Sequence, residues 1–270
     1  MSDEVNLCID IGNSQMHGGV YSNGEMITQF RKETSPRTSR DELGLFLVSV
    51  LKEMGIDPKS ITRIGMCCVV PDLVYSLKNA SRIYFGVEPL LLEAGVKTKL
   101  KIKTKNPLEV GADRIANAIA TSELYPDRDA LIVDFGTAIT FDAVSADKEY
   151  LGGSICAGMG LSMEALGSKT AKLPFVEITN SKRALGKSTI ECIQGGLYFG
   201  YLGLIKELVG RIRDEAFGDK NCLVIATGGM SQLYRNSGLF DVIVPDLVLQ
   251  GINVVLAMNP ISNQAKEYAD

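Results

Sequence analysis

The amino-acid sequence predicts an α/β protein made of two duplicated lobes, each a mixed β-sheet flanked by helices. Strand and helix patterns alternate along the chain, and a buried strand that runs into Asp-x-Gly occurs twice, at Asp10 and at Asp134. A chain of 270 residues with 46% hydrophobic residues can bury one large core or two modest ones, because domains commonly span about 100–200 residues. We expect lobes at residues 1–115 and 116–262, followed by a polar tail at 263–270.

The first lobe is predicted to open with three strands. Residues 5–9 form a short apolar run, which is typical of a buried strand. Residues 16–21 and 26–31 flank Asn23-Gly24, the dipeptide that favours a tight hairpin turn. The chain therefore begins with a strand and a hairpin.

Helices and a further strand follow in this lobe. Ser39 with Glu42 forms a capping-box pattern ahead of an apolar-periodic stretch that ends at Gly55, which predicts a helix. Residues 61–70 read as a strand stopped by Pro71, and residues 72–84 as a helix. A mixed sheet surrounded by helices accounts for this order.

The second lobe repeats the opening of the first. The strand at residues 131–133 leads into Asp134-Phe135-Gly136, a second and a third strand follow around a polar turn at 146–148, and another strand at 222–226 enters Thr227-Gly228-Gly229. Ser188 with Glu191 again suggests a capping box, and residues 248–258 a closing helix. Between them a long amphipathic helix is predicted by the apolar stripe Ile190, Ile193, Leu197, Tyr201, Leu204, Leu208 and Ile212.

Composition and charge exclude several classes of function. The net charge of −4 and the absence of a long Lys or Arg run argue against a nucleic-acid partner. No apolar stretch approaches the roughly 20 residues of a membrane span, and Met1 to Glu4 is acidic where a signal peptide would be basic. Six cysteines without a C-x-x-C pair, and a single histidine, do not suggest a zinc site or disulfides. We expect a cytoplasmic protein without a membrane partner.

Two short matches to phosphate motifs fail on context. Gly186-Lys187-Ser188-Thr189 resembles the end of a P-loop, but Ser181 stands where the first glycine belongs and no strand precedes it. Asp134-Phe135-Gly136 matches the metal triplet of protein kinases, yet the chain has no H-R-D segment. Neither match predicts a function.

The two Asp-x-Gly turns fit phosphate binding better. A carboxylate at the end of a buried strand can hold a hydrated cation, and the glycine lets backbone N–H groups approach phosphate oxygens. Thr137 in one copy, and Asn13 with Ser14 in the other, add hydroxyl or amide donors. One such turn alone is more often a plain hairpin, but two copies predict a phosphate loop in each lobe. Thr227-Gly228-Gly229 is a candidate contact to the base or ribose.

Asp113 and Arg114 stand at the start of a further predicted helix, marked by Ile115 and Ile119. The helix dipole favours an acid at this position, and an anionic ligand also binds well there. The alternative reading is a capping Asp and a surface Arg.

Several motifs in this order resemble the type III pantothenate kinases. They cover nearly the whole chain and comprise Asp10-Ile11-Gly12-Asn13-Ser14, Asn106-Pro107, Glu109 to Arg114, Asp134-Phe135-Gly136-Thr137-Ala138, Gly152-Gly153, Thr170-Ala171-Lys172-Leu173-Pro174 and Thr227-Gly228-Gly229. The resemblance implies duplicated actin-like (ribonuclease H-like) lobes with the ATP site in the cleft between them, a homodimer, and phosphorylation of pantothenate at its primary hydroxyl in the first step of coenzyme A synthesis. The chain departs from the family pattern at Thr104, where many members have tyrosine.

The resemblance also implies roles for individual residues. Asp113 would be the general base, and Asp134 would bind a monovalent cation, potassium or ammonium, while Mg²⁺ would arrive with ATP. Pantothenate contacts are implied for Gly111, Ala112, Asp113, Arg114 and Thr170. ATP contacts are implied for Asp10, Ile11, Gly12, Asn13, Ser14, Gln15, Met16, His17 and Thr137.

Two other functions stay open beside pantothenate kinase. One is a kinase of the same superfamily with another substrate, and the other is a nucleotide-binding regulator without catalysis. Asp113 favours an enzyme, because a protein that only binds a nucleotide has no chemical need for a base at that position.

Overall fold

A computed structural model describes residues 4–218 and 220–260 and divides into two compact units. Of the described chain, the first unit contains everything up to Lys99, Leu108–Glu123 and the part from Val248 onward, and the second contains Leu100–Pro107 and Leu124–Leu247. The expected tail at 263–270 lies outside the described residues, and the expected lobe boundaries stay a prediction. No helix in the described part is long and apolar enough to cross a membrane.

The first unit is built on a five-stranded mixed sheet with the order β3-β2-β1-β4-β5. β1, β2 and β3 are antiparallel neighbours, whereas β4 and β5 run parallel to β1. The predicted hairpin turn is present: Asn23 and Gly24 both have positive φ, 51° and 87°, which a tight primed turn requires. The strands are β1 (Val5–Ile11), β2 (Gln15–Ser22), β3 (Glu25–Glu33), β4 (Arg63–Cys68) and β5 (Leu90–Leu91).

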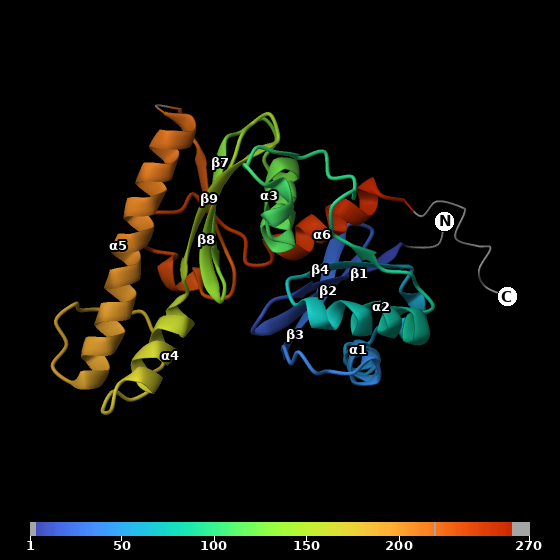
Figure 1. Ribbon diagram of the computed structural model, residues 1–270, viewed down its shortest axis with the longest axis horizontal. Helices are drawn as coiled ribbons and strands as arrows, with labels where there is room; N and C mark the ends of the chain where they lie inside the picture. The colour runs from blue at the N-terminus through green and yellow to red at the C-terminus, as the bar shows by residue number, and fades with distance from the viewer. Residues whose placement is uncertain (1–3, 219, 261–270) are drawn as a thin grey trace. The chain divides into compact units, whose positions relative to one another are not determined.

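Helices cover both faces of this sheet (Figure 1). Leucines of α1 (Arg40–Glu53) and α2 (Pro71–Phe85) pack against Leu7, Ile9 and Ile11 on one face. The predicted capping box begins α1, with both the Ser39 and the Glu42 hydrogen bonds present. The other helices of this unit are α3 (Ala112–Leu124) and α6 (Leu247–Met258), and short 3₁₀ turns lie at Pro58–Ser60 and Pro107–Glu109.

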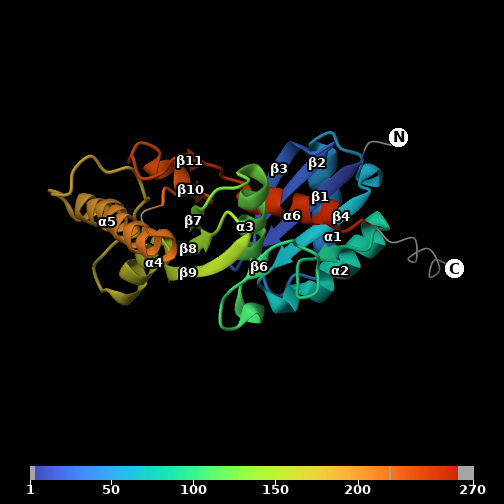
Figure 2. The ribbon, with the colours of Figure 1, turned by 90° about the horizontal axis from the view of Figure 1, so that it is seen from above.

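Helix α6 lies on the opposite face of the sheet (Figure 2). It crosses a row of small residues there. Gly19, Cys8 and Gly65 are register neighbours on β2, β1 and β4, and side chains of α6 fill the space above both glycines. Because these positions carry little or no side chain, the helix can approach the sheet closely.

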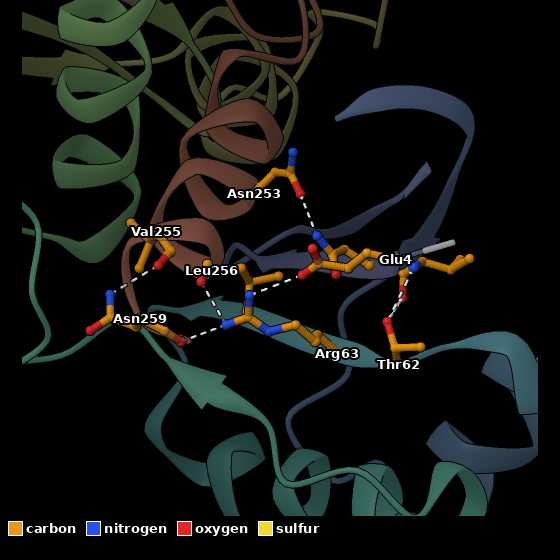
Figure 3. Close-up of polar contacts among 9 residues, drawn as sticks. Glu4, Thr62, Arg63, Asn253, Val255, Leu256 and Asn259 are labelled. Carbon is orange, nitrogen blue, oxygen red and sulfur yellow. Dashed lines mark hydrogen bonds and ion pairs between the residues drawn. The ribbon is translucent and has the colours of Figure 1, made fainter. Parts of the chain in front are cut away.

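Polar contacts also tie α6 to the strands, as Figure 3 shows. The Asn6 amide donates to Asn253 Oδ1 at 2.9 Å, and the Arg63 guanidinium donates to the carbonyl oxygens of Leu256 and Asn259 at the end of the helix. Those last carbonyls have no partner within a helix, so Arg63 satisfies two of them.

The second unit is a six-stranded mixed sheet with the order β11-β10-β7-β8-β9-β6. Its core lies on one face, where the long helix α5 (Thr189–Phe217) and α4 (Met159–Lys169) pack against β7, β8 and β10 (Figure 1). The strands are β6 (Lys101–Ile102), β7 (Ala130–Phe135), β8 (Ala138–Val144), β9 (Glu149–Ala157), β10 (Leu223–Thr227) and β11 (Val242–Ile243), with a 3₁₀ turn at Ser231–Tyr234.

The two sheets share one topology, which confirms the predicted duplication. In each, an antiparallel three-stranded meander is extended by two parallel strands, so β1 to β5 correspond in order to β7, β8, β9, β10 and β11. Strand β6 is an addition at the edge of the second sheet. The short strands β5, β6 and β11 have only two residues each and carry too little pattern to be found from sequence.

The predicted capping box at Ser188 is formed only in part. Ser188 Oγ accepts the backbone N–H of Glu191 at 3.2 Å, as expected. The Glu191 carboxylate, however, accepts the N–H of Lys187 at 2.7 Å instead of that of Ser188. The helix still begins where the pattern places it, because the Ser188 bond satisfies one of its free N–H groups.

Helix α6 touches α3 at Gly251, where an added Cβ would overlap the backbone of Ala116. We predict that Gly251→Ala lowers the free energy of unfolding by about 2 kcal/mol, because overpacking against a backbone outweighs the gain of about 1 kcal/mol in helix propensity. Urea unfolding followed by circular dichroism measures this.

Gly210→Ala is the matched control for this substitution. Gly210 lies inside α5 with no atom within 4 Å of an added Cβ, so we expect this variant to gain up to about 1 kcal/mol. Equal stabilisation of both variants would contradict the close approach of α6 to α3.

Candidate functional site

In the first unit, the central strand β1 is followed by a tight loop that begins just after Asp10. The N–H of Gly12 donates to Gln15 O at 3.0 Å. Thr34, the residue after β3, holds the loop by donating from its hydroxyl to Gly12 O at 2.8 Å and from its N–H to Ser14 O at 2.9 Å. Within the predicted ATP loop, Asn13, Ser14 and Gln15 are exposed, Asp10 and Gly12 are half-buried, and Ile11, Met16 and His17 are buried. The exposed tip of the loop is thus the part that a ligand can reach.

His17 lies away from that tip. It is 5% exposed, and its Nε2 is 2.8 Å from Gln29 Oε1 on the neighbouring strand β3. The predicted loop therefore divides into an accessible turn and a strand segment that belongs to the sheet.

Asp113 lies in the first turn of α3, as predicted, and is half-buried. Its Oδ1 accepts the N–H of Arg114 at 2.9 Å, and Gly111 O accepts the N–H of Ile115 in the first turn. A Cβ at Gly111 would stand 2.5 Å from Asp113 Oδ1. Because glycine has no side chain, residue 111 does not clash with the Asp113 carboxylate at the start of the helix.

The carboxylates of Asp10 and Asp113 both raise the pKa of one buried thiol, that of Cys67. Parallel pairing puts Cys67 on β4 directly beside Asp10 on β1. Burial raises the pKa of the Cys67 thiol well above its ordinary value, and the carboxylates of Asp10 and then Asp113 raise that pKa further. Both predicted carboxylates therefore lie within electrostatic range of Cys67, near the carboxyl edge of the first sheet.

From the sequence, the cysteines were tested only as zinc ligands or disulfides, and Cys67 was assigned no role. The signal that would have placed Cys67 beside Asp10 is the register of the two strands that carry them. A strand that returns parallel to β1 ends at the same edge of the sheet, so its last residues stand beside Asp10.

The second unit has an equivalent edge around Asp134. Asp134 is half-buried near the end of β7, and Thr137 in the following turn accepts, through its carbonyl oxygen, the N–H of Gly158 at 3.0 Å. A Cβ at Gly158 would overlap that carbonyl, and one at Gly228 would stand 2.5 Å from Asp134 Oδ1. The turn at Thr227-Gly228 is therefore next to Asp134, because β10 pairs with β7.

Thr170 ends helix α4 in the second unit. Its Oγ1 donates to Leu166 O at 2.7 Å and accepts the N–H of Leu173 at 3.3 Å, and the residue is exposed. The predicted pantothenate residues Gly111, Ala112, Asp113 and Arg114 are neighbours in the first unit. Thr170 belongs to the other unit, so its place in this predicted set stays a prediction.

Neither edge is a preformed multidentate metal cage. Among residues 4–218 and 220–260, no three His, Cys, Asp or Glu side chains lie close enough to hold a metal ion together. One carboxylate at the end of each central strand suits a cation that keeps phosphate, backbone or water oxygens as its other ligands.

Comparison with known proteins gives a consistent result. The family model described as type III pantothenate kinase matches residues 6–211. A type III pantothenate kinase of Legionella pneumophila (strain Corby) is 52% identical over 253 residues, covering 94% of this chain and 98% of its own. The corresponding protein of Elusimicrobium minutum is 46% identical over the same length and coverage.

Solved structures agree on the fold. A putative Baf family transcriptional activator from Campylobacter jejuni has a TM-score of 0.60 at 22% identity, covering 94% of this chain and 98% of its own. A putative 2-dehydro-3-deoxygalactonokinase from Sinorhizobium meliloti has a TM-score of 0.59 at 13% identity, covering 95% and 98%. The fold is therefore the actin-like fold that sugar kinases share. The family model matches most of the chain, and the two relatives are 52% and 46% identical to it over 94% of its length. The chain therefore belongs to the type III pantothenate kinase family.

Proposed function

We propose that this chain uses ATP to phosphorylate the primary hydroxyl of pantothenate, giving 4'-phosphopantothenate in the first step of coenzyme A biosynthesis. The observation that carries the proposal is that Asp10, the register partner of Cys67, and Asp113 at the start of α3 both raise the pKa of the Cys67 thiol. Phosphoryl transfer needs a nucleophile with a base beside it and a nearby site for the metal–phosphate group. Family membership supports the substrate.

In this mechanism Asp113 is the general base. Its carboxylate accepts the proton of the pantothenate hydroxyl as that oxygen bonds to the γ-phosphorus and the bond from the γ-phosphorus to the leaving ADP breaks. The N–H of Arg114 donates to Oδ1 and helps to orient the carboxylate. The start of α3 and the Arg114 guanidinium favour the carboxylate of pantothenate, because helix N-termini and arginine attract anions.

Asp10, Gly12 and the exposed residues Asn13, Ser14 and Gln15 would receive the phosphates of ATP, and Mg²⁺ would arrive with the nucleotide. The turn that carries Thr137 would supply the second phosphate loop. Its shape is maintained by two backbone bonds, Gly136 N–H to Ala138 O and Gly158 N–H to Thr137 O. Backbone donors fixed in this way need no reorganisation when charge develops on the phosphoryl group.

Asp134 is the proposed ligand of a monovalent cation, potassium or ammonium. The turn at Gly228 supports this role, because a Cβ there would stand 2.5 Å from Oδ1 and only glycine lets the turn lie this close to the carboxylate. A cation there, when bound, supplies positive charge near the phosphates of ATP.

A homodimer is supported by apolar side chains that the second unit leaves exposed around α4 and the start of α5. Large exposed hydrophobic areas commonly mark protein interfaces. Sedimentation velocity should give twice the mass of one chain, and a monomer at micromolar concentration would reject the dimer. The side chains concerned are Ile155, Leu161, Phe175, Leu185 and Ile190.

The substrate is tested by ADP release from Mg-ATP in potassium buffer, with and without pantothenate. We expect release that depends on pantothenate and yields phosphopantothenate. Turnover with a sugar or acetate but not with pantothenate would indicate another kinase, and ATP binding without any turnover would indicate a regulator.

Asp113→Asn should lower kcat by at least about 100-fold, because general base catalysis commonly contributes 10²–10⁴. The amide keeps the shape and the bond to Arg114 N–H but cannot take the proton. Glu123→Gln, an exposed carboxylate at the other end of α3, should retain the wild-type rate. Near-normal turnover by folded Asp113→Asn would remove Asp113 as the base.

Potassium or ammonium should activate the enzyme over choline chloride at constant ionic strength, and Asp134→Ala should abolish that activation. Asp147→Ala, an exposed acid in the turn between β8 and β9, is the control and should keep the wild-type response. Rates that are equal in all salts for the wild type would refute the cation site.

A further inference from the structure

Side chains with an oxygen atom flank Asp134 on both sides in the second sheet. Thr227 on β10 pairs with Asp134 on β7, and Asp134 pairs with Thr140 on β8. Residues paired in register project to the same face of a sheet, with Cβ atoms about 4.5–5.5 Å apart in an antiparallel pair. A carboxylate with a hydroxyl on each side therefore forms one row across three strands.

The hydroxyl of Thr140 is oriented by a buried carboxylate. Thr140 Oγ1 donates to Asp142 Oδ2 at 3.0 Å, and the Tyr150 hydroxyl donates to Asp142 Oδ1 at 2.5 Å. Asp142 and Tyr150 are both 0% exposed. Burying an ionised carboxylate is costly unless strong donors satisfy it, so a fold that retains Asp142 here constrains both hydroxyl groups.

This network has a consequence for the side of Thr140 that faces Asp134. A threonine hydroxyl has one proton, and that of Thr140 is given to Asp142. Thr140 therefore has only lone pairs to offer toward Asp134. An oxygen acceptor next to a carboxylate, fixed so that it cannot donate, suits a positive ion.

The first unit provides a comparison within the same chain. At the equivalent positions Asp10 is flanked by Cys67 on β4 and by His17 on β2. The buried Cys67 thiol is neutral because burial raises its pKa, and thiol and imidazole are poor ligands for alkali cations, which prefer oxygen. The two copies of the motif thus differ in the ligand type beside the carboxylate.

We propose that Thr140 and Thr227 are ligands of an alkali cation at Asp134, and that Asp142 with Tyr150 positions Thr140 for this role. The proposal rests on the proposed cation site at Asp134 and adds its oxygen ligands. It also explains why a monovalent cation binds at the second Asp-x-Gly copy and not at the first. Backbone, water or phosphate oxygens complete the coordination.

The test is a potassium titration of Thr140→Val, with choline chloride keeping the ionic strength constant. Valine keeps the shape and removes the oxygen, so the potassium concentration for half-maximal activation should rise about tenfold, as expected for one lost contact to a charge. The rise in melting temperature that potassium gives the wild type should shrink in parallel, which is a readout independent of turnover. Thr140→Ser keeps the hydroxyl and should remain within about twofold of the wild type.

Thr227→Val tests the other side of the row and replaces Thr140→Val if that variant does not fold. Wild-type potassium curves in a folded Thr140→Val or Thr227→Val protein would overturn the proposal. A wild type whose melting temperature and rate ignore potassium would overturn both this proposal and the cation at Asp134. Pantothenate-dependent ADP release in that same experiment would still support the kinase function, so the two failures are distinguishable.

Discussion

Parallel pairing of the central strands is the constraint on which the candidate site depends. It brings the ends of β1 and β4 to one edge of the first sheet, and the ends of β7 and β10 to one edge of the second. Parallel strands of an open α/β sheet present their carboxyl ends together, and ligands bind at that edge. Asp10 and Asp134 occupy this position in the two copies, each followed by a glycine turn.

The packing of α6 connects this edge to the chemistry of Asp113. Gly19 and Gly65 let α6 lie directly on the first sheet, and Gly251 lets α3 lie close against α6. The start of α3, which carries Asp113, is thereby held near β4, where its carboxylate acts on Cys67. Small residues in the sheet and in α6 thus help to position the proposed base, because protein interiors are close-packed and transmit displacement.

The duplicated lobes have kept their topology and diverged in the residues beside the carboxylate. Equivalent strands run in the same order in both sheets, which preserves the backbone geometry of the phosphate loop. Substitutions beside the carboxylate do not disturb that geometry, since strand pairing uses backbone groups. The proposed division of roles, metal–phosphate binding at one copy and a monovalent cation at the other, fits the different neighbours of Asp10 and Asp134.

Local signals in the sequence determined the elements and the motif residues. Hydrophobic periodicity, the Ser39 cap, the Asn23-Gly24 turn and the repeated Asp-x-Gly are short-range patterns, and the structure has the corresponding strands and helices. Only the tertiary structure decided which side chains meet. The pairing of Asp10 with Cys67, the row around Asp134 and the bond from Thr140 to Asp142 depend on strand register and helix packing. These follow from contacts between distant residues, which no local pattern encodes.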